Sequence, residues 1–349
     1  MLNFAKEVLK KIKLFLLYWA KIIFVKNKFK VSFFNKLRSN IGGGFLADQY
    51  VLYDLKHNSK KEYLSEFDWY RSRYINEPFE AALNNKVICN DILKQYIKVA
   101  ETYFIKNKGN ILDFETGIRS TEDVYNCLLE NKNLIIKPFA LGKGIGVNLL
   151  SYDGENLLID NKVVTKDELL KHLDSRDSYI ICEYMKQHEY ANKLYDKTTN
   201  TIRTIALRDV ETHQFKIYFA VQRIGVFNSI PVDNGSKGGL VAEVNLETGE
   251  LREARCLHDL NVYYKHPDSG NDIKGAVIPN WKGIMEEVLA ASNRLPYMNF
   301  IAWDLLITED GEVSVIEANT SSGVNILQLW EGQRNKELGD FYRYYGAIK

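Results

Sequence analysis

The sequence predicts an α+β protein in which two α+β lobes follow a mostly helical N-terminal region. Two observations support this fold class. Apolar and aromatic residues recur at helical spacing before residue 108, whereas short β-rich runs dominate after Asn131. At 349 residues and 46% hydrophobic content, the chain is long and apolar enough for one large or two medium domains, each with a core.

Residues 1–40 are strongly basic, with ten Lys/Arg and one acid in a chain whose overall charge is +1. Their most hydrophobic stretch, Leu14 to Val25, has twelve residues, contains Lys21 and is too short to span a bilayer. Lysines follow it where a signal peptide would have small residues, which argues against cleavage. We expect a basic amphipathic helix here. It either lies on an anionic membrane surface or docks on the protein's own core, and the lysine excess favours the membrane.

A turn or hinge is predicted at Gly42 to Gly44, because glycine adopts positive φ without steric cost. This places a boundary near residue 40. Apolar and aromatic residues then recur at helical spacing, so we expect residues 41–130 to be mostly helical. These residues are Phe67, Tyr70 and Tyr74, followed by Ile92, Tyr96, Val99 and Tyr103.

The two lobes are expected at residues 131–185 and 186–349. In the small lobe, strands are predicted at 134–137, 147–152, 156–159 and 179–185, with a helix at 166–173. In the large lobe, strands are predicted at 201–208, 215–225, 240–245, 300–308 and 313–317, with a helix at about 281–294.

The cysteines and histidines exclude several enzyme classes. The four cysteines lie far apart without a CxxC pair, which is typical of reduced core thiols in a cytosolic protein. The six histidines form no HxxxH or HExxH pair, and there is no GxSxG motif. A zinc hydrolase and the commonest serine hydrolases are therefore not expected.

A glycine-rich loop follows a short strand that ends at Lys137. Glycine stands at every second position, at Gly142, Gly144 and Gly146, with Lys143 between the first two. Such a loop lets main-chain N–H groups approach phosphate oxygens and can close as a lid, while Lys137 would neutralise phosphate charge. The loop is neither a Walker A motif nor a Rossmann fingerprint, and taken alone it also fits an ordinary hairpin.

A predicted hairpin joins the strands 300–307 and 313–319. Asp304 stands in an otherwise apolar strand, and Glu317 and Asn319 share one face of the next strand. Hard oxygen ligands on adjacent strands suit Mg²⁺, so these three residues are the candidate metal ligands. Without a cation we expect the two carboxylates to repel one another. The alternative is a solvated hairpin with surface acids.

Further polar residues lie on the central strands of the large lobe. Arg203 is a candidate for contacting a γ-phosphate or a substrate carboxylate, and Arg223 is a second candidate; a surface arginine is the alternative for each. Asn200 is a tentative candidate for binding the acceptor. A polar loop is another, although it also fits an ordinary connection between strands; its residues are Asn234, Lys237, Gly238 and Gly239.

Together these segments resemble the ATP-grasp superfamily, and most closely its sugar-transfer-associated branch. The matching pieces, IIKPFALGKGIGV, ICEYM, NTIRTIALRD, DNGSKGG and FIAWDLLITEDGEVSVIEAN, stand in the family's order from about Asn131 to the C-terminus. The resemblance implies an ATP-grasp fold, with ATP and Mg²⁺ as cofactors held between the two lobes.

The resemblance also implies residue roles. Lys137 contacts the ATP phosphates under the glycine-rich lid, Arg203 lies near the γ-phosphate, and the metal is held by Asp304, Glu317 and Asn319. The backbone that binds adenine is Glu183, Tyr184 and Met185, and Glu189 is the nearest choice for the ribose hydroxyls. Many relatives have an Asp-Lys pair near the start of the grasp; here only Lys94 stands near the corresponding place.

The function implied is an ATP-dependent ligase that activates a carboxylate as an acyl phosphate for attack by an amine, in cell-surface polysaccharide (for example capsule) biosynthesis. The alternatives are an ATP-grasp kinase acting on a small-molecule or sugar acceptor and a non-catalytic membrane-associated adaptor. We expect a small-molecule or sugar-linked acceptor and no nucleic-acid partner. We also expect a cytoplasmic protein, with peripheral binding of residues 1–40 to the inner face of the cell membrane as an alternative.

Overall fold

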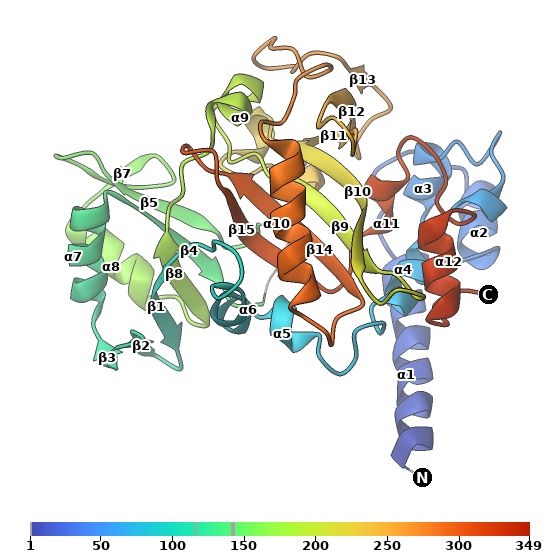
Figure 1. The fold of residues 1–349 in the computed structure, drawn as a ribbon, viewed down its shortest axis with the longest axis horizontal. Coiled ribbons are helices and arrows are strands. Elements are labelled where there is room, and N and C mark those ends of the chain that lie inside the picture. The colour runs from blue at the N-terminus through green and yellow to red at the C-terminus, as the bar shows by residue number, and fades with distance from the viewer. Residues whose placement is uncertain (1, 116, 141–143) are drawn as a thin grey trace.

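Two antiparallel sheets form the body of the protein in a computed structural model that describes residues 2–115, 117–140 and 144–349. Each sheet carries helices of its own, and a helical N-terminal region lies beside the larger sheet (Figure 1). The predicted α+β fold class and the helical N-terminal region are confirmed.

The small-lobe sheet has the strand order β3-β2-β1-β8-β4-β5-β6-β7. Its strands are β1 (Thr102–Asn107), β2 (Asn110–Leu112), β3 (Ile118–Arg119), β4 (Asn133–Pro138), β5 (Asn148–Tyr152), β6 (Leu157–Ile159), β7 (Lys162–Val164) and β8 (Tyr179–Glu183). The helices α7 (Thr121–Asn131) and α8 (Lys166–Asp174) cover one face of this sheet (Figure 1). Leu128 of α7 and Leu173 of α8 are completely buried against Leu134 and Leu150 of the strands.

The structure corrects the expectation that residues 41–130 are mostly helical, because β1 to β3 lie within that range. Tyr103, one of the residues at helical spacing, belongs to β1, where aromatic and β-branched residues are favoured. Phe104 of β1 pairs with Ile181 of β8, so burial against a distant strand overrides the local periodicity. The small-lobe sheet therefore begins at Thr102 and not after residue 130.

The large-lobe sheet has the strand order β13-β12-β11-β10-β9-β14-β15. Its strands are β9 (Ile202–Arg208), β10 (Phe215–Ile224), β11 (Leu240–Val244), β12 (Leu251–Cys256), β13 (Val262–Tyr263), β14 (Phe300–Ile307) and β15 (Val313–Asn319). The predicted β14–β15 hairpin is confirmed, and all eight residues of β14 are buried. This central position makes β14 a rigid support for any side chain that it carries.

Helices pack on both faces of the large sheet. On one face, Trp281 and Val288 of α10 (Trp281–Asn293) join the larger core; on the other, α11 (Val324–Leu327) and α12 (Glu337–Tyr344) pack with Leu64 of the N-terminal region. The predicted helix at about 281–294 is thus confirmed. Short elements in the connections are α9 (Glu189–Leu194), η3 (Phe227–Ser229) and η4 (Gly235–Lys237).

The N-terminal region consists of several short helices in place of one helix over residues 1–40. Its elements are α1 (Leu2–Tyr18), a π-helical turn η1 (Trp19–Ile23), α2 (Phe33–Ile41), α3 (Ala47–Leu52), η2 (Lys60–Glu62), α4 (Glu66–Ser72), α5 (Ala81–Asn84) and α6 (Lys86–Leu93). The expected turn is present at Gly44, which has φ +75° and whose Cβ, if added, would lie 2.4 Å from that of Phe67. None of the described helices combines the length and apolar character needed to cross a bilayer.

The four cysteines are free thiols, as expected. Three of them are buried and Cys127 is half-buried. Burial raises the pKa of Cys89 to about 12. This thiol is therefore protonated at neutral pH, which suits a packing role better than a nucleophilic one.

Candidate functional site

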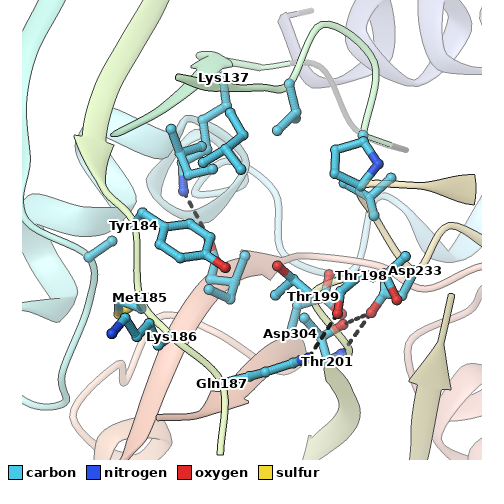
Figure 2. A pocket seen from close by; sticks show the side chains of 18 of the residues that line it. Lys137, Tyr184, Met185, Lys186, Gln187, Thr198, Thr199, Thr201, Asp233 and Asp304 are labelled. Atoms are coloured by element: carbon cyan, nitrogen blue, oxygen red, sulfur yellow. Dashed lines mark hydrogen bonds between the residues drawn. The ribbon is translucent and has the colours of Figure 1, made fainter. Parts of the chain in front are cut away.

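A cavity of about 700 Å³ lies between the two sheets and the segment that joins them. This volume falls within the range of about 300–1,000 Å³ that is usual for small-molecule sites. The small lobe contributes Lys137 and Leu149, the large lobe contributes Thr201 and Asp304, and Tyr184 comes from the joining segment (Figure 2). The cavity therefore combines apolar walls with a few charged groups.

The joining segment, Glu183 to Lys186, forms one wall of the cavity. It is held from outside, because Glu309 N–H donates to the carbonyl of Lys186 (3.0 Å) and Glu101 N–H donates to the carboxylate of Glu183 (3.2 Å). Among the described residues, Tyr184 and Met185 make no main-chain hydrogen bond. Their N–H and C=O groups are thus available to the polar edge of a planar ligand.

Lys137 occupies the roof of the cavity at the end of β4 (Figure 2). It is only 6% exposed, and its ammonium group donates a long hydrogen bond of 3.4 Å to the carbonyl of Ile316. A buried ammonium is costly unless it is strongly paired, so this cation is suited to an anionic ligand.

Lys86 is a second buried lysine in the cavity wall, and the sequence analysis missed it. It begins α6, where the side chain of Asn85 caps the helix, and its main-chain N–H donates to the carbonyl of Phe139 just beyond β4 (2.9 Å). Its Nζ lies 3.5 Å from a carboxylate oxygen of Glu317. Lys94, the weak candidate from the sequence, is exposed and pairs with Asp91 at 2.6 Å.

Strand register brings the charged residues of the large lobe together. Arg203 on β9 stands directly opposite Asp304 on β14, and Asp304 stands directly opposite Glu317 on β15. Side chains at opposed positions of antiparallel strands share one face and contact each other. A row of one arginine and two acids therefore crosses three strands beside the cavity.

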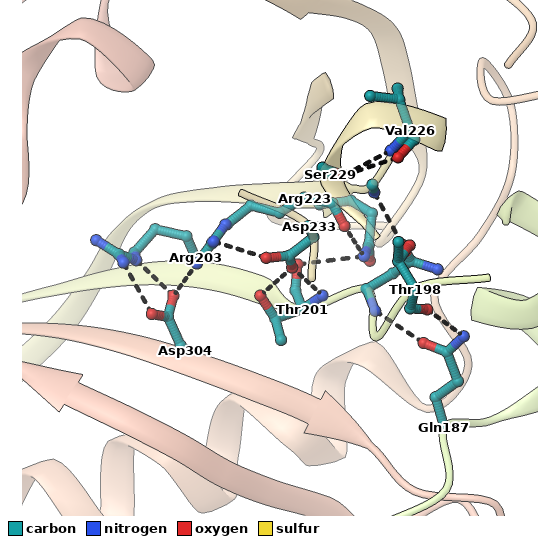
Figure 3. Close-up of polar contacts among 12 residues, drawn as sticks. Gln187, Thr198, Thr201, Arg203, Arg223, Val226, Ser229, Asp233 and Asp304 are labelled. Carbon is teal, nitrogen blue, oxygen red and sulfur yellow. Dashed lines mark hydrogen bonds and ion pairs between the residues drawn. The ribbon is translucent and has the colours of Figure 1, made fainter. Parts of the chain in front are cut away.

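Asp304 is held by two arginines (Figure 3). Arg203 binds it through two hydrogen bonds, Nε to Oδ1 at 2.6 Å and Nη2 to Oδ2 at 2.8 Å, and Arg223 Nη1 lies 3.1 Å from Oδ1. Burial alone would raise the pKa of Asp304, but the charges and hydrogen bonds of the two arginines outweigh it and lower the pKa below its usual value. This carboxylate is ionised and fully paired.

Asp233 is a further buried acid that the sequence analysis did not single out. It accepts hydrogen bonds from the main-chain N–H of Thr201 (2.7 Å) and from its hydroxyl (2.5 Å), and it pairs with Arg223 at 2.6 Å (Figure 3). Burial raises the pKa of Asp233, against the opposing effect of Arg223. Asp233 fixes Arg223 at the cavity, where both residues form part of the lining.

The structure separates the roles of the two predicted arginines. Arg223 lines the cavity, whereas Arg203 is not among the described lining residues. The guanidinium of Arg203 is used by Asp304 and by Ser322, whose hydroxyl lies 3.2 Å from Nη1. Arg203 therefore holds Asp304 in place, whereas Arg223 lines the cavity together with Lys86 and Lys137.

The predicted metal ligands are only partly gathered. Asp304 and Glu317 both line the cavity, whereas Asn319 stands opposite Ala302 and is not among the described lining residues. We expected the two carboxylates to repel one another in the absence of a metal ion. The structure corrects this, because arginines compensate the charge of Asp304 and Lys86 pairs with Glu317. Within the described residues, no group of three or more His, Cys, Asp or Glu side chains is placed to hold a metal ion.

The glycine-rich loop lies partly outside the described residues, since Gly142 and Lys143 are not among them. Gly144 has φ +63° and lines the cavity, and an added Cβ would lie 3.1 Å from the side chain of Val232 in the large lobe. Gly146 has φ +73° and is not a lining residue. A glycine at position 144 therefore permits close contact between the loop and the opposite lobe.

Glu189 does not fulfil the expected ribose-binding role. It lies on α9, its side chain is 74% exposed, and it pairs with Lys193 one helical turn away at 2.8 Å. We predict that Glu189→Gln leaves nucleotide affinity within about twofold of wild type, because an exposed pair of this kind contributes little. Titration of wild type and variant with a fluorescent ATP analogue checks this. A tenfold or greater loss of nucleotide affinity would show that Glu189 takes part in nucleotide binding.

Asn200 is a structural residue, contrary to its tentative role in acceptor binding. Its side-chain oxygen accepts from Thr198 (2.7 Å) and Gly225 (3.0 Å), and its amide nitrogen donates to the carbonyls of Ala191 (3.1 Å) and Tyr195 (2.6 Å). These four bonds use the full capacity of an asparagine side chain. It is buried and braces the start of β9.

The described residues of the polar loop after Asp233 differ in their placement: one lines the cavity, and the others do not. Asn234 lines the cavity, whereas Lys237, Gly238 and Gly239 are not among the described lining residues. At Gly239 an added Cβ would lie 2.6 Å from the carbonyl oxygen of Asp233, so this glycine allows the tight turn. Only Asn234 of this group is placed to meet a ligand in the cavity.

The profile of the sugar-transfer associated ATP-grasp family matches residues 67–338, a range that includes both antiparallel sheets around the cavity. The chain belongs to the sugar-transfer associated ATP-grasp family. The match includes β1 to β3 and α4 to α6, and so begins well before the small-lobe boundary that the sequence motifs indicated. No curated protein matches the chain.

The comparison with solved structures finds several ligases at low identity. A D-alanine-D-alanine ligase from Coxiella burnetii is 12% identical with a TM-score of 0.39, and the match covers 76% of this chain and 53% of that one. The D-Ala:D-Ser ligase VanG from Enterococcus faecalis is 14% identical with a TM-score of 0.40, covering 71% and 55%. The ligase PsnB, solved with a minimal precursor, Mg and ADP, is 12% identical with a TM-score of 0.37, covering 71% and 53%. This chain spans 53 to 55% of the length of these three proteins.

Proposed function

We propose that this ATP-grasp protein is an ATP-dependent ligase that activates a carboxylate as an acyl phosphate for attack by an amine or a similar nucleophile. The observation that supports this most is the cavity between the lobes. It places two buried lysines and a joining segment with available main-chain groups opposite a row of paired arginines and acids. The acceptor is proposed to be a small or sugar-linked molecule of cell-surface polysaccharide biosynthesis, in line with the family description.

The residues present fit ATP. Apolar side chains such as Ile135, Leu149 and Met185 line the cavity beside the joining segment, as a purine ring requires. The free main-chain groups of Tyr184 and Met185 suit the polar edge of adenine. Lys137 and Lys86 supply positive charge within the same cavity, as a triphosphate requires.

The fit to Mg²⁺ is partial. Asp304 and Glu317 offer hard oxygen ligands on adjacent strands at the cavity, and Mg²⁺ is commonly held by one or two carboxylates plus phosphate oxygens. Both carboxylates are paired with cationic side chains, so metal binding would compete with Lys86 for Glu317 and with the arginines for Asp304. When bound, the metal would offset negative charge on the transferred phosphoryl group.

The reaction is balanced without any further co-reactant. A carboxylate oxygen of the acceptor attacks the γ-phosphorus, the bond to the β-phosphate oxygen breaks, and ADP leaves. The nucleophile then attacks the acyl carbon, phosphate leaves, and the amine gives up a proton. Lys86, Lys137 and Arg223 hold the negative charge of the phosphates throughout, and the apolar wall excludes water that would hydrolyse the acyl phosphate.

A kinase would use the same cavity but would stop after the first transfer. We predict that hydroxylamine, added with Mg-ATP and a panel of amino acids and uronic acids, yields a hydroxamate and ADP in a carboxylate-dependent reaction. Mass spectrometry of the products is the measurement. A stable phosphorylated product without hydroxamate would establish the kinase instead, and nucleotide binding without ADP release across the panel would favour the non-catalytic adaptor.

A further inference from the structure

The helix α1 is anchored to the body at its C-terminal end, where it continues into η1. Ile22 is completely buried, the hydroxyl of Tyr18 donates to the carbonyl of Asn40 (2.6 Å), and the amide of Asn40 donates to the carbonyl of Ile22 (3.1 Å). The ring of Tyr18 also packs edge-on against Phe67 at 5.1 Å. From this anchor the helix projects away from the rest of the molecule (Figure 1).

The projecting helix carries an apolar face whose side chains are exposed. At 100° per residue, its exposed apolar side chains fall within an arc of about 140°. Phe4 is 77% exposed, and Phe15 and Leu16 are each 61% exposed. The exposed apolar residues of this face are Phe4, Val8, Leu9, Ile12, Phe15 and Leu16.

Lysines border this arc on both sides. On the helical wheel Lys11 lies next to one edge of the arc, and Lys13 and Lys6 lie next to the other. Lys10 faces the body, where its ammonium group lies 4.4 Å from the ring centre of Tyr74. The apolar arc therefore points away from the protein with positive charge along both borders.

Exposed aromatic residues continue this surface beyond the helix. Trp19 lies 6.2 Å from Phe15 and 5.8 Å from Phe24 between ring centres, and Phe24 is 74% exposed. The short helix α2 shows a second apolar stripe, with Phe33, Phe34, Leu37 and Ile41 exposed at spacings that share one face. Isolated exposed apolar residues are ordinary, but a contiguous stripe of this extent indicates an interaction surface.

We propose that the apolar face of α1, with Trp19 and Phe24, docks the protein on an anionic lipid surface. Charge selects this partner over a second copy of the chain, because residues 1–40 carry ten Lys/Arg and one acid. Two such segments repel one another, whereas acidic lipid headgroups attract them. An apolar arc bordered by lysines lies naturally at the boundary between headgroups and acyl chains. This inference does not depend on the proposed ligase activity.

The test is co-sedimentation of the full-length protein with vesicles of phosphatidylcholine, with and without phosphatidylglycerol. We expect binding to the vesicles that contain phosphatidylglycerol, and weaker binding at high salt because the lysine contribution is screened. Phe15→Glu is expected to weaken this binding at least about tenfold, since it removes a phenyl group that would insert into the lipid and adds a negative charge. Lys6→Glu with Lys11→Glu is expected to abolish the preference for the acidic lipid.

Ile118→Glu is the matched control, because Ile118 is even more exposed than Phe15, at 77% against 61%, but lies on β3 in the small lobe, at the other end of the molecule (Figure 1). It is expected to bind vesicles like wild type. The proposal is overturned if wild type binds neither vesicle, or if Phe15→Glu and Ile118→Glu behave alike. It is equally overturned if Phe15→Glu converts a dimer to a monomer in light scattering while wild type ignores vesicles, since a second copy is then the partner.

Discussion

Asp304→Asn is expected to abolish turnover and to destabilise the folded protein by about 3–5 kcal/mol. The neutral amide leaves Arg203 and Arg223 buried without their shared counterion, and each arginine is mostly enclosed, with side chains 14% and 19% exposed. Thermal unfolding without nucleotide measures the stability, and ADP release measures the turnover. A variant as stable as wild type would contradict the role of this carboxylate as the centre of the cluster.

Asp310→Asn provides the matched control for this experiment. Asp310 lies in the turn of the same β14–β15 hairpin, is 58% exposed and pairs with Lys98 at 3.4 Å. Exposed pairs of this kind contribute about 0–1 kcal/mol, so stability and turnover should stay close to those of wild type. A large effect at Asp310 would show that the hairpin as a whole, and not the buried carboxylate, is sensitive to charge.

The pairing of Asp304 with the two arginines also predicts how the stability of the folded protein changes as the pH falls. Because the folded-state pKa of Asp304 is lowered, its contribution to stability is present above the unfolded-state pKa of about 3.9 and is lost as the pH falls through the lower folded-state value. Asp304→Asn lacks this contribution at every pH. The stability difference between wild type and variant should therefore shrink on acidification below about pH 4.

The sequence predicted Asp304 and Glu317 as neighbours because both belong to one local hairpin, and the structure confirms that register. It did not predict their compensation by arginines. The pairing of Asp304 with Arg203 depends on β9 lying against β14, about a hundred residues away in the chain, and no local pattern reports it. The expectation that the two carboxylates stay uncompensated without a metal was therefore wrong, although the residues were correctly identified as neighbours.

Lys86 and Asp233 were missed for a related reason. Lys86 follows a good helix cap, Asn85, and looks like an ordinary surface lysine until α6 is placed against the end of β4. Asp233 stands in a polar loop whose other members are turn residues. A signal for Lys86 did exist: the missing Asp-Lys pair left the site short of a cation, and Lys86 is another lysine within the region 41–130 that was expected to be mostly helical.

The small-lobe boundary shows how tertiary pairing overrides periodicity. Val99 and Tyr103 fit a helical repeat with the residues before them, yet Val99 forms a bridge with Val315 and Tyr103 lies in β1. The three residues Tyr103, Phe104 and Ile105 have side chains that favour a strand, and this local preference was a better guide than spacing. By contrast, β14, β15 and α10 were predicted almost to the residue, because their turns and caps are local.

Lys137→Met is expected to lower ATP affinity about 10- to 100-fold without lowering the stability of the nucleotide-free protein. The affinity loss follows from removing a charged hydrogen bond to phosphate, worth about 1.5–3 kcal/mol. The stability should hold or rise, since Lys137 is 6% exposed and the described partner of its ammonium group is a single carbonyl at 3.4 Å. Methionine fills a similar volume without the cost of burying a charge.

The control for this prediction is Lys106→Met, because Lys106 is also a buried lysine of the small-lobe sheet. Its ammonium group donates to the carbonyls of Leu173 (2.9 Å) and Asp174 (3.0 Å), at the end of α8. Its loss should lower the melting temperature while nucleotide affinity stays at the wild-type value, the reverse of the result for Lys137. Thermal shift with and without Mg-ATP reads both effects together, since only a competent site gains stability from the ligand. Equal nucleotide-induced shifts in both variants would mean that Lys137 is a structural lysine and that the phosphates bind elsewhere.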